Sequence, residues 1–181
     1  MISLSSFSFI QTWFTQGLLH PLQTPSHLLL IISIGFLIGQ NGRLVKHLSL
    51  LVLSLIAGFI LNHNFSLKWD FELIILAYAL IISLFVVLKL EQIKSFVFIF
   101  VIICGLMLGF DSSPIVIPGL GENSIFNWLA GAAISILGVI LLLSIIALFL
   151  RHYWNGIILR VIGSWIATSA LFTLTLQFAK I

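Results

Sequence analysis

The amino-acid sequence predicts an all-α membrane protein, built as a bundle of six transmembrane helices. Of its 181 residues, 61% are hydrophobic and only 7% are charged, and the mean hydropathy is +1.26. A soluble domain has about a quarter of its residues charged, and a small one keeps much of its surface in water. The composition therefore favours lipid as the solvent of this chain.

Six apolar stretches have about the length that a helix needs to cross the hydrocarbon core, which is ~20 residues. In a bilayer such stretches form helices, because no water is present to satisfy the backbone polar groups. Short polar or glycine-containing segments separate the six stretches, which together make up a transmembrane domain at residues 25–178. The predicted spans are residues 25–40, 44–61, 71–88, 95–110, 125–150 and 156–178.

Residues 1–24 precede the first span and form a separate N-terminal segment. They mix Phe and Trp with Ser, Thr and Gln, and Trp13 suits the boundary between lipid and water. We expect this segment to lie on the membrane surface rather than across the membrane.

Lys and Arg residues are distributed unequally between the two sides that six spans create. The loops after the first, third and fifth spans, together with the adjoining first turns of the second and sixth spans, hold six of the eight bases. Cytoplasmic loops carry such an excess, so we expect both termini outside the cytoplasm of a bacterial inner or plasma membrane. The six bases are Arg43, Lys46, Lys89, Lys94, Arg151 and Arg160, and the other two are Lys68 and Lys180.

Composition and motifs exclude several classes of function. Five acidic and eight basic residues are too few for a nucleic-acid-binding surface, and the single cysteine, Cys104, can form no intrachain disulfide. The sequence contains no Gly-x-Ser-x-Gly, no His-Glu-x-x-His and no Gly-rich phosphate loop, so we expect no enzyme. No charged residue lies near the middle of a predicted span, where proton relays are found. Polar chemistry is therefore expected near the helix ends.

Small residues recur at a spacing of four residues in the last three predicted spans. Such pairs allow two helices to approach closely, and that is the role we expect for them here. The pairs are Gly105 with Gly109, Gly131 with Ser135, and Gly163 with Ala167.

Two histidines lie close to the start of the first span. Thr24 is a favourable N-cap residue and Pro25 suits the first position of a helix, which puts His27 in the first helical turn. His20 lies seven residues upstream, at a stiff turn that contains Pro21. Two imidazoles brought together at a helix end could bind a transition-metal ion. In the alternative interpretation, His27 hydrogen-bonds a neighbouring helix and His20 lies at the membrane interface.

This segment resembles the first signature of the HupE/UreJ family of hydrogenase and urease accessory membrane proteins, His-Pro-x-x-Gly-x-Asp-His-Leu-Leu. His20, Pro21 and His27 match this signature in register, and two leucines follow. The family's Gly is Thr24 here, and its Asp is Ser26. Members of the family have six membrane helices and are regarded as permeases for nickel and in some cases cobalt.

The fourth span resembles the family's second signature, His-Gly-x-x-His-Gly-x-Glu. Residues 104–111 read Cys-Gly-Leu-Met-Leu-Gly-Phe-Asp, so both glycines align. Cys104 replaces the first His, Leu108 the second, and Asp111 the Glu. Cys104 and Asp111 are seven residues apart, which puts them on one face of a helix. The last two spans resemble the family more weakly. Taken together, the resemblance covers most of residues 17–178.

The resemblance implies a permease for a divalent transition-metal ion, nickel first and cobalt second, that supplies a metalloenzyme such as urease or hydrogenase. The implied ligands are His20, His27, Cys104 and Asp111, and they bind the ion in transit rather than permanently. The expected partners are the lipid bilayer, the metal ion, and a second copy or another membrane protein, but no nucleic acid. Because one family Asp and one family His are missing, the alternative is a non-transporting accessory or scaffold subunit descended from such a permease.

Overall fold

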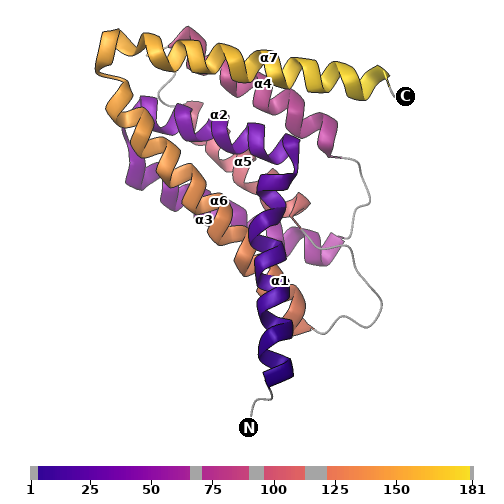
Figure 1. Ribbon diagram of the computed structural model, residues 1–181. Coiled ribbons are helices and arrows are strands. Elements are labelled where there is room, and N and C mark those ends of the chain that lie inside the picture. The colour runs from indigo at the N-terminus through magenta and orange to yellow at the C-terminus, as the bar shows by residue number, and fades with distance from the viewer. Residues whose placement is uncertain (1–3, 66–70, 90–95, 113–121, 180–181) are drawn as a thin grey trace.

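The computed structural model describes residues 4–65, 71–89, 96–112 and 122–179, and within these ranges the chain is helical apart from short connections (Figure 1). The helices from α2 onward match the six predicted spans to within about one turn at each end, so the predicted all-α six-helix bundle is confirmed. The described helices are α1 (Leu4–Gln23), α2 (Pro25–Asn41), α3 (Leu44–Phe65), α4 (Glu72–Leu88), α5 (Phe96–Asp111), α6 (Glu122–Leu150), the short 3-10 helix η2 (Tyr153–Gly156) and α7 (Ile157–Ala179).

The helices differ in how well each could cross a membrane by itself. Among the described residues, three helices are long and apolar enough alone, with spanning parts at Leu44–Asn62, Asn123–Leu150 and Ile157–Ala179. The second half of α1 and the whole of α2 qualify only as a pair, and this pair is bent by 74°. α4 and α5 have 17 and 16 residues, so they are apolar but shorter than the ~20 residues of a full span.

The outside of the bundle is apolar. Leu53 on α3, Phe149 on α6 and Trp165 on α7 are 66%, 67% and 68% exposed, and many other large hydrophobic side chains face outward beside them. Extended exposed apolar patches are rare on soluble monomers but are solvated by lipid tails in a bilayer. The chain is therefore a multi-pass integral membrane protein.

α2 is the central helix of the bundle and packs against α4, α5, α6 and α7. It is apolar on all sides, as expected of a helix buried all round, and Leu30, Ile31 and Ile38 are completely inaccessible. The Ser144 hydroxyl on α6 donates a hydrogen bond to the Gly35 carbonyl oxygen over 3.0 Å, which ties α6 to α2. This position encloses the first turn of α2, and with it His27, between neighbouring helices.

The four glycines of these pairs lie where helices approach one another, so the predicted packing role is confirmed for them. Gly105 and Gly109 on α5 lie against the backbone and Ser54 of α3. Gly131 on α6 lies against α1, and Gly163 on α7 lies against α4. These contacts leave no room for larger side chains at the α3–α5 and α1–α6 crossings.

The N-terminal segment differs from its prediction in one respect. α1 continues as a helix through His20 and Pro21, where the sequence had predicted a turn, and the chain turns only at Thr24. Pro21 lies in the last turn of α1, where it removes one backbone N–H donor and where only two helical residues follow it. From this corner α1 runs along the first half of α6 rather than over the bundle (Figure 1). The interfacial position of residues 1–24 stays a prediction.

The described basic residues gather at the end of the bundle opposite to this corner. The Arg151 guanidinium packs over Gly42, which ends α2 with a φ of 83° that favours glycine. Arg160 donates a hydrogen bond from Nε to the Val87 carbonyl oxygen over 2.9 Å, near the end of α4. Cations beside helix C-termini are electrostatically favourable. Three bases of the topology prediction, Lys68, Lys94 and Lys180, lie outside the described residues.

Candidate functional site

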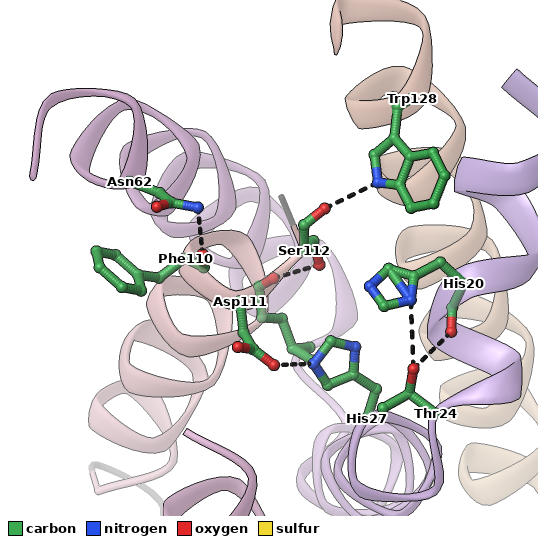
Figure 2. A network of polar contacts seen from close by, with 9 residues as sticks. His20, Thr24, His27, Asn62, Phe110, Asp111, Ser112 and Trp128 are labelled. Atoms are coloured by element: carbon green, nitrogen blue, oxygen red, sulfur yellow. Dashed lines mark hydrogen bonds and ion pairs between the residues drawn. The ribbon is translucent and has the colours of Figure 1, made fainter. Parts of the chain in front are cut away.

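Four helix segments meet at the corner between α1 and α2. The last turn of α1, the first turn of α2, the end of α5 and the first half of α6 each contribute side chains to a network of polar contacts (Figure 2). By the predicted topology, this end of the bundle lies on the non-cytoplasmic side of the membrane. We call the side chains His20, Thr24, His27, Asp111 and Trp128 the corner cluster.

His27 is the most enclosed member of the corner cluster. Its side chain is 0% exposed, and its Nε2 lies 2.7 Å from Oδ2 of Asp111, the last residue of α5. An ionised carboxylate only accepts hydrogen bonds, so Nε2 carries a proton in this contact. The bond joins the two segments that resemble the family signatures, and it agrees with the interpretation that His27 hydrogen-bonds a neighbouring helix.

Two polar atoms at the start of α2 are buried without a hydrogen-bond partner among the described residues. They are Nδ1 of His27 and the hydroxyl oxygen of Ser26, which stands where the family has Asp. Leaving a buried polar group unsatisfied costs about 1–3 kcal/mol. A ligand that accepts the lone pair of His27 Nδ1 would remove part of this cost, so the nitrogen is suited to binding a cation.

His20 lies beside His27, although the two belong to different helices. Their ring centroids are 5.5 Å apart, with a tilt of 50° between the rings. Thr24 holds His20 in place, because its Oγ1 lies 3.3 Å from His20 Nδ1 and donates to the His20 carbonyl oxygen over 3.0 Å. Thr24 occupies the predicted N-cap position and Pro25 follows it, but the Thr24 side chain makes no capping hydrogen bond to α2.

Trp128 and Ser112 complete the corner, and sequence reasoning did not find this pair. The Trp128 indole N–H donates to the Ser112 carbonyl oxygen over 3.0 Å, and the indole ring lies 5.4 Å from the His20 ring. Asn62 on α3 similarly donates to the Phe110 carbonyl oxygen over 2.6 Å. These bonds satisfy backbone carbonyls at the end of α5. A tryptophan near the start of a span looks like an ordinary interfacial aromatic, so the sequence carries no specific signal for this contact.

Cys104 lies away from the corner cluster. It is completely buried on α5, two helical turns or about 10 Å deeper than Asp111. The structure thus brings His20, His27 and Asp111 together but not Cys104. In the described part of the chain, no three His, Cys, Asp or Glu side chains are placed closely enough to hold a metal ion as they stand. The assignment of all four as metal ligands stays a prediction.

Comparison with known protein families places this chain in one of them. The family described as HupE / UreJ protein matches residues 6–173. The chain belongs to the HupE/UreJ family. This family is associated with hydrogenase and urease accessory roles and with nickel and cobalt transport, and its members are not known enzymes. No curated protein and no solved structure matches the chain.

In this HupE/UreJ protein the two signature segments meet at their ends. His27 comes from the first signature and Asp111 from the second, and their side chains are in direct contact. The two positions that depart from the first signature also lie here, because Thr24 contacts His20 and Ser26 is buried beside His27. The departures therefore change the immediate surroundings of the two histidines.

Proposed function

We propose that the chain is a permease for a divalent transition-metal ion, nickel first and cobalt second, that supplies a metalloenzyme such as urease or hydrogenase. Family membership supports the class of ion. The observation that carries the proposal is the direct contact of His27 with Asp111, next to the His20 ring. Imidazole nitrogen is a donor that both nickel and cobalt accept in proteins, and the Asp111 contact fixes one of the two imidazole rings.

The small number of donors suits transport rather than storage. An ion in transit must bind strongly enough to enter and weakly enough to leave. In the proposed route, the ion first binds at the corner cluster and then passes Cys104, which lies deeper along α5. Imidazole nitrogen and the softer cysteine sulfur differ in metal preference, so the two positions would hold the ion with different strengths.

Nickel uptake by cells that express the protein tests this function. We expect His27→Ala to reduce uptake to the level of cells carrying an empty vector, because the substitution removes one imidazole and leaves Asp111 without its partner. Uptake is measured as cell-associated nickel over time, normalised to the amount of protein in the membrane.

Two further variants control this experiment. His152→Ala removes an exposed histidine at the opposite end of the bundle and should retain full uptake. His27→Gln keeps most of the side-chain volume and a donor for Asp111, so its loss of uptake would reflect the missing imidazole rather than misfolding. Equal uptake by the wild type and His27→Ala would refute the site.

Two observations favour the alternative of a non-transporting accessory or scaffold subunit. No group of three potential ligands is assembled within the described residues, and two family ligands are replaced. This alternative predicts that His20→Ala and His27→Ala leave function intact and that the protein copurifies stoichiometrically with a partner. Purification as a lone oligomer that binds one nickel ion per protomer would count against it.

The proposed orientation places both termini outside the cytoplasm of a bacterial inner or plasma membrane. The described basic residues at the end opposite to the corner cluster support it. We expect alkaline phosphatase fused after Ile181 to be active and green fluorescent protein fused at the same position to remain dark. The reverse pair of results would invert the topology and place the corner cluster on the cytoplasmic side.

A further inference from the structure

The contact between His27 and Asp111 determines which nitrogen of His27 can act as a ligand. The carboxylate accepts from Nε2, so a neutral His27 ring carries its single proton on Nε2. Nδ1 then has a lone pair, and this atom is buried without a partner among the described residues. A carboxylate that fixes the tautomer of a metal-binding histidine is a common arrangement around metal sites.

The Thr24 hydroxyl has the opposite effect on His20. A hydroxyl group has one proton, and the shorter of the two Thr24 contacts runs to the His20 carbonyl oxygen, at 3.0 Å. With that proton donated to the carbonyl, Oγ1 accepts from His20 Nδ1, which lies 3.3 Å away. A neutral His20 ring therefore carries its proton on Nδ1, and its Nε2 has the lone pair.

The two lone pairs lie within reach of one ion. Each ring uses one nitrogen for its partner, and in Figure 2 the second nitrogen of each ring lies on the side of the other ring. Metal–nitrogen bonds of about 2.1 Å place the centroids of two imidazoles on one ion roughly 4.5–6.5 Å apart. The observed 5.5 Å between the His20 and His27 rings falls within this interval.

We propose that Thr24 and Asp111 are positioning residues that hold His20 and His27 in opposite tautomers, so that His20 Nε2 and His27 Nδ1 bind the same metal ion. The identity of the ion rests on the proposed function, whereas the tautomers do not. Asp111 then acts through His27 instead of binding the ion itself. Thr24, which stands where the family has Gly, contributes a hydrogen bond that a glycine cannot make.

The tautomers can be read directly from the metal-free protein. The full chain is labelled with ¹⁵N-histidine and reconstituted in lipid nanodiscs, and the signals of its five histidines are assigned with His20→Gln and His27→Gln. Protonated and unprotonated ring nitrogens have well-separated ¹⁵N shifts. At a pH where both rings are neutral, we expect the proton on Nδ1 in His20 and on Nε2 in His27. The reverse tautomer in either ring would overturn the proposal.

Substitution of Thr24 tests its hydrogen bond in the same spectra. Thr24→Val keeps the shape of the side chain but removes the hydroxyl, so His20 should become a mixture of tautomers. Thr24→Ser keeps the hydroxyl and should retain the wild-type spectrum. An unchanged His20 signal in Thr24→Val would show that another group fixes this ring, which contradicts the role of Thr24.

The two Asp111 variants separate a positioning role from direct binding. Nickel affinity is measured by titration of the purified full chain. Asp111→Asn retains an oxygen that accepts from His27 Nε2, and its Kd should stay within about threefold of the wild type. Asp111→Ala removes the acceptor, and its Kd should rise roughly 10–100-fold, the usual effect of losing such a partner. Equal losses in both variants would make Asp111 a ligand.

The nickel-binding measurements and the ¹⁵N spectra test the two proposals independently. If the wild-type protein does not bind nickel or cobalt, the proposed function is wrong, and the ¹⁵N spectra still decide whether Thr24 and Asp111 set the tautomers. If nickel binds but the spectra show other tautomers, the permease proposal stands and the positioning proposal is wrong.

Discussion

Replacing Gly109 with valine is expected to lower the melting temperature of the purified protein by roughly 6–12 °C. A Cβ atom at this position would meet the Leu55 carbonyl oxygen and would lie 3.1 Å from the Gly58 Cα atom, both on α3. These neighbours are backbone atoms, so they cannot move without separating α3 from α5. Overpacking a close contact costs about 3 kcal/mol, which corresponds to this shift for a chain of this length.

The matched control is Gly138→Val on α6. A Cβ atom there would meet no atom within 4 Å, and valine suits a helix slightly better than glycine does. We expect its melting temperature to equal or slightly exceed that of the wild type. Thermal unfolding of both variants in the same detergent provides the comparison. An unchanged melting temperature for Gly109→Val would mean that α3 and α5 are not in close contact.

Replacing Gly17 with valine is expected to weaken nickel binding while the bundle stays folded. Gly17 lies on α1 against the Trp128 backbone, and a Cβ atom there would lie 2.9 Å from the Trp128 Cα atom. The new side chain must push α1 away from α6 and carry His20, one turn later, away from His27. Losing one imidazole as a ligand should raise the Kd for nickel tenfold or more, equivalent to ~1.4 kcal/mol or above.

Gln16→Val introduces the same side chain one residue earlier, on an exposed position of α1. It should keep the wild-type Kd, because α1 can remain docked on α6. Both variants should have melting temperatures closer to the wild type than Gly109→Val does, since α1 packs mainly on α6. Equal nickel affinities for Gly17→Val and Gln16→Val would show that α1 docking does not position His20.

Hydropathy and turn residues were sufficient to predict the helices of the bundle. The start of α2 at Pro25 and the end of α6 at Leu150 agree with the predicted spans, because lipid-facing and buried positions are both apolar in a membrane helix. The predicted turn at His20 and Pro21 was wrong. A proline predicts a break, but contacts with α6 that no local pattern encodes stabilise α1 up to Gln23, two residues beyond Pro21.

The candidate site could be predicted only in part. The spacing of His20 and His27 around Pro25 indicated that two imidazoles could converge, and the ring distance of 5.5 Å agrees with this. The contact between His27 and Asp111 spans 84 positions in the sequence, and no helical periodicity determines which ends of α2 and α5 meet. The contact of the Thr24 hydroxyl with His20 could not be predicted either, since the side chain of an N-cap threonine normally accepts a hydrogen bond from its own helix.

The bend of 74° between α1 and α2 has a thermodynamic consequence. His20 belongs to α1 and His27 to α2, so an ion bound by both rings, as proposed, would link α1 to the central helix of the bundle. Such linkage is reciprocal: the ion tightens the attachment of α1 to α6 by as much free energy as that attachment adds to ion affinity. Occupancy of the proposed site at the corner cluster would thereby be coupled to the docking of α1 on the first half of α6.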